Sequence, residues 1–523
     1  MSLRRVVRLA AMVLPTLLCL SCGQVYRPVV IPCSEGGIPG CPQPTPAIPG
    51  SFHSVFAISA NVPGYPGGAM QIDVSGDAII AQTPTGDVSA PNLGNVPTNA
   101  ATLPNNSRVF VTSAGSIVPG GIDVLASFTP ASGSPLGGGF GPVATIGLQL
   151  GSQPVFVNTT QNTAVYVANF GTNSVSAVSL ISNVVTNTAP VGVQPVSLAE
   201  TPDGNKLYVV NQGDNTVNSF NILNLTPNTV TGFAGVAPVW VVARNDSQKV
   251  YVLTQGDGQL VTIDTATDTV TSSLPVGGPG ANFIFYDPHL NRLYVTNPQS
   301  SMLYIFSDTG GANDTPIQLA SISFAAGQPT CPAKTTTACL PTSVTALADG
   351  SRFYVASYQT AAACPDTFVG TASQCVIPSL AVFNANSFAL QYPNAQYPSA
   401  PTMTLLTYPP FGVNLATNQY QYAVPRVATC VSPVYPTLYA PPATRFRMFT
   451  TASTDSSHVY VGMCDAGVIA VINTSGSNTN NSGGTTTPPD TLITDLPAAY
   501  SAGPIQANGL PPNQNPIFML TGQ

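Results

Sequence analysis

Charged side chains are scarce in this chain, and so are the residues that most often carry catalysis. Only 7% of its 523 residues are Asp, Glu, Lys or Arg, against about 25% in a typical soluble domain. The histidines are His53, His289 and His458, and the glutamates are Glu35 and Glu200. General acid–base catalysis relies mainly on His, Glu, Asp and Lys, so this chain has few residues that could act as a catalytic acid or base.

Sequence signatures of common active sites are missing as well. The chain has no Gly-x-Ser-x-Gly elbow, P-loop, His-Glu-x-x-His motif or dinucleotide-binding fingerprint. The part that follows Cys22 has no Cys-x-x-Cys pair of the kind that binds zinc. We therefore predict no catalytic residue, no metal site and no cofactor. We expect His289 and His458, which fall in predicted turns, to be solvated and structural.

Helical periodicity is also absent. No long stretch has the i, i+3, i+4 apolar spacing of an amphipathic helix. The chain instead contains 51 Pro and 46 Gly, which indicate many turns, while 44% apolar residues are enough for a large core. The composition predicts an all-β protein.

The N-terminal residues 1–21 have the features of an export signal. Arg4, Arg5 and Arg8 precede an apolar run from Leu9 to Leu20, which is too short to span a bilayer as a helix. Residues 20–23, Leu-Ser-Cys-Gly, resemble a bacterial lipobox, although Cys19 stands where Leu is expected. We expect lipidation at Cys22, with plain secretory cleavage as the alternative. The product would be an exported lipoprotein that faces the periplasm or the cell surface.

Removal of the signal leaves an acidic chain. Without its three arginines, 11 basic and 21 acidic residues give a net charge of −10. Because no Lys/Arg cluster remains, nucleic acid is not an expected partner. Membrane contact is expected only through the lipid, and we expect a monomer.

The other cysteines suggest an oxidising compartment. Eight remain after Cys19 and Cys22, mostly as close neighbours in sequence, which favours disulfides over metal binding. These disulfide candidates are Cys33, Cys41, Cys331, Cys339, Cys364, Cys375, Cys430 and Cys464. Their connectivity is left open.

A four-residue motif recurs at a nearly constant interval. It begins at Tyr166, Tyr208, Tyr251 and Tyr294, in steps of 42, 43 and 43 residues, and reads Tyr-Val-x-Asn in three of the four copies. A period of about 40–45 residues built from short strands is typical of a β-propeller blade. Looser copies at 109–113, 353–357 and 459–462 give seven second strands.

An eighth copy is predicted at residues 516–521. It has no room for further strands, so we expect residues 54–58 and 69–73 to supply the third and fourth strands of its blade. Pairing the N- and C-terminal strands would close the ring and remove exposed sheet edges. The domain organisation is then a signal at 1–21, a Pro/Gly-rich tether at 22–51 and one propeller at 52–523.

Residues 154–310 carry a family resemblance. The Pro-Asp-Gly turn at 202–204, the Tyr-Val-Thr-Asn strand and the Val-Gly-x-x-Pro junctions resemble the YVTN-type β-propeller repeat family of exported bacterial proteins. The resemblance implies a ring of seven blades, whereas the copies counted here give eight, and both remain open. It implies little about activity.

Several recurring residues have structural interpretations. Tyr and Val of each motif should pack between blades, and Trp240 should be a core residue rather than a ligand platform. The aspartates that follow the first strands should bond their own turn backbone. They are Asp203, Asp246, Asp287, Asp349 and Asp455.

Irregular loops gather on two adjacent predicted blades. Loops between second and third strands share one face with the blade-to-blade junctions, and the inserts at about 328–341, 359–378 and 391–443 map to that face. Ordered loops on a rigid scaffold often bind ligands, and tyrosine is a favoured contact residue. The candidate binding surface is Tyr358, Tyr392, Tyr397, Tyr408, Phe411, Tyr420, Tyr422, Tyr435 and Tyr439.

The leading functional hypothesis is a non-enzymatic binding or scaffold module of the cell envelope. Its partner would be a protein, a peptide or a glycan. The alternative is a propeller enzyme, either a lactonase-like hydrolase or a cofactor-dependent oxidoreductase, that uses the central channel. That alternative requires polar groups converging on the channel. A covering role for the Tyr-rich insert, without any ligand, is equally open.

Overall fold

The computed structural model describes most of the chain from residue 53 onward. The described residues are 53–60, 66–74, 77–85, 96–103, 107–114, 120–126, 141–159, 164–308, 315–331, 337–361, 375–391, 403–404, 413–414, 419–420, 447–465, 467–475, 489–498 and 515–522. Within them no helix is long and apolar enough to cross a membrane.

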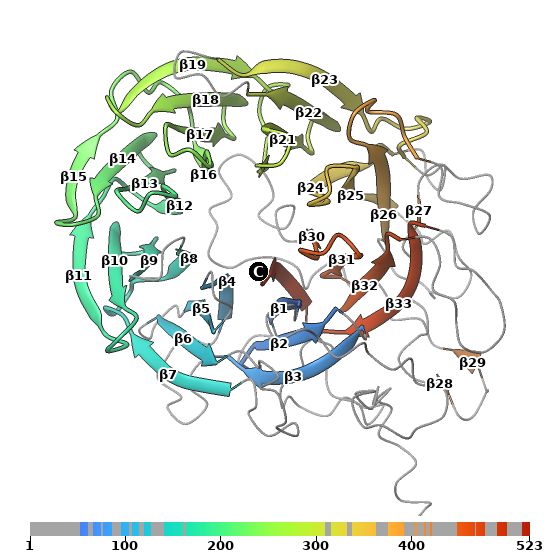
Figure 1. Cartoon of the computed structure of the whole chain (residues 1–523), viewed down its shortest axis with the longest axis horizontal. Coiled ribbons are helices and arrows are strands. Elements are labelled where there is room, and N and C mark those ends of the chain that lie inside the picture. The colour runs from blue at the N-terminus through green and yellow to red at the C-terminus, as the bar shows by residue number, and fades with distance from the viewer. Residues whose placement is uncertain are drawn as a thin grey trace, which may run out of the picture.

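Eight four-stranded antiparallel sheets form a closed ring, an eight-bladed β-propeller (Figure 1). Blades 2–8 each use four strands in chain order from the axis outward, so the eight-copy count is correct. Blade 2 is β4 (Val96–Thr102), β5 (Arg108–Ala114), β6 (Gly121–Ala126) and β7 (Gly141–Gly147), and blade 3 is β8 (Pro154–Asn158), β9 (Ala164–Asn169), β10 (Ser174–Ser179) and β11 (Val185–Pro190).

The remaining blades in chain order follow the same plan. Blade 4 is β12 (Pro195–Glu200), β13 (Lys206–Asn211), β14 (Thr216–Asn221) and β15 (Thr226–Thr229), and blade 5 is β16 (Pro238–Ala243), β17 (Lys249–Thr254), β18 (Gln259–Asp264) and β19 (Thr269–Pro275). Blade 6 is β20 (Phe283–Asp287), β21 (Arg292–Asn297), β22 (Met302–Ser307) and β23 (Ile317–Ser323). Blade 7 is β24 (Leu340–Ala346), β25 (Arg352–Ala361), β26 (Cys375–Asn384) and β27 (Met403–Thr404), and blade 8 is β30 (Met448–Ala452), β31 (His458–Met463), β32 (Val468–Asn473) and β33 (Thr491–Pro497). A separate two-stranded sheet is formed by β28 (Val413–Asn414) and β29 (Gln419–Tyr420).

Blade 1 joins the two ends of the chain, as predicted, but the strand roles differ. Its order is β34 (Asn515–Thr521), β1 (Ser54–Ala60), β2 (Gly68–Asp73) and β3 (Ala78–Pro84), with β34 nearest the axis (Figure 1). The C-terminal strand is therefore a first strand, not a second one. The prediction was wrong because β1, which carries Val55-Phe56-Ala57 where other blades carry Tyr-Val, was not recognised as a second strand.

Alternating side chains of each second strand pack on opposite sides of its blade. In β13, Tyr208 and Val210 belong to the apolar cluster shared with blade 5, whereas Leu207 and Val209 belong to the larger core cluster. This is the packing predicted for the repeat, because side chains alternate between the two faces of a strand. The final Asn of the motif holds the hairpin that follows it. Asn211 Nδ2, for example, donates to Thr216 Oγ1 and Asn218 Oδ1.

The recurring turn aspartates bond their own backbone, as predicted. In each case the amide two residues later donates to the aspartate Oδ1, over 2.8–3.1 Å. The five donors, in order, are the amides of Asn205, Gln248, His289, Ser351 and Ser457. These side chains therefore shape the turns between first and second strands.

Adjacent blades are held together by a repeated contact that we call the latch. In it, the first residue of a second strand and the aromatic residue two positions later reach the outer turn of the next blade, between its third and fourth strands. In the latch from blade 4 to blade 5, Lys206 Nζ lies 2.9 Å from Asp268 Oδ2 and donates to the Thr265 carbonyl at 2.5 Å. The Tyr208 hydroxyl donates to Asp268 Oδ1 at 2.5 Å.

The same geometry recurs elsewhere in the ring. Between blades 7 and 8, the Arg352 guanidinium and the Tyr354 hydroxyl both contact Asp490, each at 2.5 Å. Between blades 2 and 3, Arg108 donates to the Leu180 carbonyl at 2.8 Å and to Asn183 Oδ1 at 3.2 Å. Asp268, Asp490 and Asn183 all have positive φ, between 52° and 58°, a conformation that Asp and Asn adopt more readily than most residues.

Blades 5 and 6 are joined by a buried ion pair. Arg244, in the turn between β16 and β17, donates through Nη1 to both carboxylate oxygens of Asp308 at 2.9 Å. The side chains of Arg244 and Asp308 are 1% and 0% exposed. Arg244 also contacts Asp246, which is one-third exposed. A buried charge that loses its partner is strongly destabilising.

We predict that Asp308→Ala lowers the free energy of unfolding by about 3–5 kcal/mol, because it leaves the Arg244 charge buried without its main partner. Urea unfolding followed by circular dichroism would measure the change. Asp246→Asn is the control, for which we expect a loss of under about 1 kcal/mol, since the contact with Arg244 is partly solvated and the amide oxygen can still accept from the Gln248 amide. Equal losses in the two variants would contradict the assignment.

Candidate functional site

The first strands present one residue per blade toward the axis at the same register. In blades 1–5 and 7 the first strand carries a proline two residues before the inward residue, and a β-bulge separates the two, as between Pro238 and Trp240. A bulge redirects the side chain that follows it. From blade 1 to blade 8 the inward residues are Phe518, Asn99, Phe156, Ser197, Trp240, Phe283, Ser343 and Phe449.

Five of these residues form a continuous aromatic layer across the axis. Ring centroids are 5.4 Å apart for Phe156 and Trp240, 5.1 Å for Trp240 and Phe283, 5.5 Å for Phe283 and Phe449, and 4.6 Å for Phe449 and Phe518. All five are buried. Two of the contacts skip a blade, which is possible because the intervening inward residue is a serine.

Two of the three polar inward residues bond sideways. Asn99 Oδ1 accepts a hydrogen bond from the Val157 amide at 3.2 Å, and Ser343 Oγ accepts one from the Thr450 amide at 3.0 Å. They thus satisfy backbone donors on the inner edge of the next blade. The prediction that Trp240 is a core residue is confirmed, and at this level the axis is filled by apolar rings rather than lined by converging polar groups.

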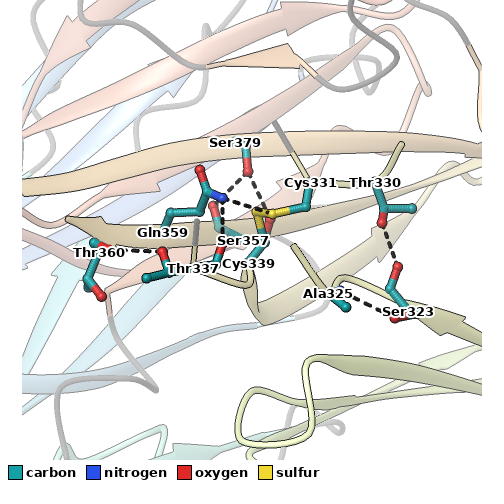
Figure 2. Close-up of a disulfide and its surroundings, with 10 residues drawn as sticks. All are labelled: Ser323, Ala325, Thr330, Cys331, Thr337, Cys339, Ser357, Gln359, Thr360 and Ser379. Atoms are coloured by element: carbon teal, nitrogen blue, oxygen red, sulfur yellow. Dashed lines mark hydrogen bonds between the residues drawn. A yellow bond between two sulfur atoms is a disulfide. The ribbon is translucent and has the colours of Figure 1, made fainter. Parts of the chain in front are cut away.

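One face of the ring carries the strand ends that lead into the predicted inserts of blades 7 and 8, and we call it the loop face. It carries the loops between second and third strands and the blade-to-blade junctions. Cys331 and Cys339 form a disulfide in the junction between blades 6 and 7. Figure 2 shows Gln359 of β25 pointing at this loop, with Nε2 2.8 Å from the Thr337 carbonyl and 3.1 Å from Cys331 Sγ. The hairpin of β25 and β26 runs further than predicted, since Gln359 to Ala361 pair with Cys375 to Ile377.

A buried charged cluster lies beside this hairpin. Arg447, immediately before β30, places its guanidinium 4.9 Å from the ring centroid of Tyr358 in β25. Its Nε lies 3.0 Å from Oδ2 of Asp465, in the loop between β31 and β32, and these side chains are only 8% and 4% exposed. The contact lacks hydrogen-bond geometry, and neither buried oxygen of Asp465 accepts a hydrogen bond.

Burial has a marked effect on this carboxyl group. It raises the pKa of Asp465 to about 7, and the neighbouring Arg447 guanidinium only partly opposes the rise. A buried carboxyl that is ion-paired with Arg447 but accepts no side-chain hydrogen bond, and whose pKa is shifted, is a candidate for a functional role. This Arg447–Asp465–Tyr358 cluster is the candidate functional site.

The residues proposed from sequence are only partly described. Tyr358 is 2% exposed, and its ring packs against the Arg447 guanidinium, so it does not offer a free surface. Tyr420 lies in β29, where only the backbone is described. Cys464 is disulfide-bonded. The remaining predicted residues lie outside the described residues, and so does the Cys375 side chain; they are Cys22, Cys33, Cys41, Cys364, Cys430, Tyr392, Tyr397, Tyr408, Phe411, Tyr422, Tyr435 and Tyr439.

Sequence reasoning missed Arg447 and Asp465, and it missed the aromatic layer. The layer had a usable signal, since Phe156, Trp240 and Phe518 each stand two residues after a first-strand proline. Arg447 and Asp465 had none, because they are 18 positions apart in irregular segments. Across the part of the chain that is described, no three His, Cys, Asp or Glu side chains come together as a metal site.

Comparison with known proteins finds solved structures of low sequence identity. No protein-family model matches the chain, and no curated protein matches it. Similar solved structures include a putative 6-phosphogluconolactonase from Bacteroides uniformis, with 12% identity and TM-score 0.45 over 68% of this chain and 97% of that one. Another is the periplasmic gluconolactonase of Pseudomonas aeruginosa, with 11% identity and TM-score 0.45 over 90% and 99%. A third is the β-propeller domain of Cps50 (Swd1) from Myceliophteria thermophila, with 8% identity and TM-score 0.45 over 72% and 95%.

We predict that Trp240→Ala destabilises the ring by about 3–5 kcal/mol, because it removes the ring that joins Phe156 to Phe283 and leaves a cavity on the axis. Thermal and urea unfolding would measure the loss. Ser197→Ala, at the same register of blade 4, is the control. Its hydroxyl is buried without a hydrogen-bond partner, so this substitution should be close to neutral. A Trp240→Ala loss below about 1 kcal/mol would show that the layer is not continuous.

Proposed function

We propose that the protein is an exported, lipid-anchored β-propeller of the YVTN type that serves as a binding module, with its recognition site on the loop face over blades 7 and 8. The observation that carries this proposal is the Arg447–Asp465–Tyr358 cluster. Its buried, unsatisfied carboxyl costs stability, and proteins keep such groups mainly where a site needs them.

The chemistry of the cluster favours a ligand rich in hydrogen-bond donors. Asp465 offers two acceptor oxygens, and Arg447 supplies a positive charge beside an aromatic ring. Both Asp465 oxygens are buried, so a peptide amide or a sugar hydroxyl would reach them only after neighbouring side chains move. A peptide, protein or glycan is the proposed partner class. The segment between β27 and β30 begins and ends at the loop face, and its tyrosines would add contact area.

The direction of the chain is compatible with an anchor at Cys22. His53, just before β1, contacts Thr454 in the turn between β30 and β31 through Nδ1 and Oγ1, which are 2.6 Å apart. That turn lies on the face opposite the loops. A lipid-linked tether that enters there would leave the loop face pointing away from the membrane.

Asp465→Asn is expected to reduce capture of envelope peptides and glycans at least tenfold while leaving the melting temperature within a few degrees. The amide keeps the size of the side chain but removes the negative charge and one acceptor. Capture would be measured with immobilised protein against a solubilised envelope fraction and a glycan array. Asp349→Asn, in a turn on the opposite face, is the matched control and should capture like the wild type. Unchanged capture by Asp465→Asn would remove the cluster from the binding site.

A second candidate function is hydrolysis of a lactone, favoured by the Asp465 pKa of about 7. A carboxyl that titrates near neutrality is suited to general acid–base catalysis, and Arg447 would stabilise negative charge on a carbonyl oxygen. Glucono-δ-lactone, chosen because a similar structure is a gluconolactonase, is the probe.

On this second function, purified protein should open the lactone at a rate that changes through pH 7 as Asp465 titrates. Asp465→Asn should lower that rate at least 100-fold and abolish the pH dependence. Hydrolysis would be followed by proton release in weakly buffered solution. A wild-type rate equal to that of spontaneous hydrolysis would exclude lactone hydrolysis, and binding would remain as the proposed function.

A further inference from the structure

The latch between blade 8 and blade 1 differs chemically from the other latches. His458 starts β31 and Tyr460 follows two residues later, in the positions that Lys206 and Tyr208 occupy in blade 4. Their target is Asp77, in the outer turn between β2 and β3. Tyr460 donates its hydroxyl to Asp77 Oδ1 at 3.2 Å, and His458 Nε2 lies 3.5 Å from Asp77 Oδ2. A titratable imidazole therefore replaces the permanent cation found at this position in blades 4 and 7.

This latch also holds the seam of the ring. Strands β1, β2 and β3 belong to the N-terminal end of the chain, whereas β31 and β34 belong to its C-terminal end. The two ends are joined by β1–β34 pairing and by contacts with blade 8, which include Asp77 with His458 and His53 with Thr454. Loosening the Asp77 contact would weaken the closure itself.

Hydrogen bonds on the far side of the imidazole fix where its proton lies. Ser457 Oγ donates to Asp455 at 2.7 and 2.8 Å, so it accepts from His458 Nδ1, which is 2.7 Å away. The neutral imidazole then carries its proton on Nδ1 and presents the lone pair of Nε2 to Asp77. Nε2 is buried, lies 3.5 Å from Asp77 Oδ2 and makes no hydrogen bond in the structure. A protonated Asp77 can donate to this lone pair, whereas an ionised Asp77 cannot.

The electrostatics agree with this arrangement. Burial raises the pKa of Asp77 to about 7, with additional contributions from the negative charges of Asp73 and Asp455, while the Tyr460 hydrogen bond opposes the rise. Burial lowers the pKa of His458, partly opposed by Asp455. Both shifts favour a neutral pair that shares one proton.

We propose that Asp77, His458 and Tyr460 form a pH-sensitive latch at the seam of the propeller, closed by a proton held between Asp77 and His458 and loosened when that proton leaves. Above neutral pH the ionised Asp77 faces the Nε2 lone pair and the charges of Asp73 and Asp455. The latches to Asp268 and Asp490 keep their Lys or Arg cation over the same range and do not loosen.

The sign of the effect follows from the Asp77 shift. A carboxyl whose pKa is higher in the folded state stabilises that state fully at low pH, and its contribution is lost as pH rises toward the folded value of about 7. The buried His458 acts in the opposite direction below its ordinary pKa of 6.5. A comparison with a variant that lacks only the Asp77 titration, made at the same pH, separates the two.

Hydrogen exchange of the full-length protein, read by mass spectrometry at pH 5.5 and pH 8, tests the latch. Asp77→Asn supplies a permanent N–H donor toward Nε2, and Asn tolerates the positive φ of 49° at this position. At pH 8 the amides of β1 and β2 should exchange at least tenfold faster in the wild type than in Asp77→Asn. At pH 5.5 the two should differ by less than about threefold.

Two further variants keep the test decisive. His458→Lys copies the blade 4 latch into the seam, so at pH 8 it should slow exchange in β1 and β2 relative to the wild type. Asp268→Asn is the matched control, and it should speed exchange in blades 4 and 5 at both pH values without changing the seam. Equal exchange of β1 and β2 in wild type, Asp77→Asn and His458→Lys at pH 8 would overturn the proposal.

Discussion

The contact between the second strand of one blade and the outer turn of the next is the interaction on which this ring depends. A four-stranded sheet cannot bury both of its faces alone, so each blade is stable only against its neighbours. Apolar side chains supply the area, but Lys206 with Asp268, Arg352 with Asp490 and Arg244 with Asp308 fix the register between blades. Four of the buried charged residues, Arg244, Asp268, Asp308 and Asp490, make these contacts.

The centre of the ring and its loop face have different characters. On the axis, Phe156, Trp240, Phe283, Phe449 and Phe518 make an apolar layer that ties non-adjacent blades together. On the loop face, the buried pair of Arg447 and Asp465 is left poorly hydrogen-bonded. The regular part of the repeat forms the apolar core, whereas the residues suited to binding or catalysis lie where the repeat is interrupted. This division is the reason for placing the proposed recognition site over blades 7 and 8.

Most of the fold could be predicted from local pattern. The spacing of the Tyr-Val motifs gave the blade period, and the Asp-containing turns behaved as expected because their hydrogen bonds span only two residues. The closing blade was predicted in outline, yet the role of β34 was assigned wrongly, since Phe56 in place of Tyr hid the second strand. The candidate site was not predicted, and His458, expected to be solvated, is buried at the seam.

The sequence by itself determined the period and the strand alternation, because these depend on residues close together in the chain, whereas the structure decided between seven and eight blades. Only the tertiary structure decided which side chains meet across it. Phe156 reaches Trp240 past a whole blade, Arg447 finds Asp465 beside Tyr358, and Asp77 meets His458 from the opposite end of the chain. Such contacts follow no sequence period. They form because closure of the ring places residues from distant parts of the chain next to one another.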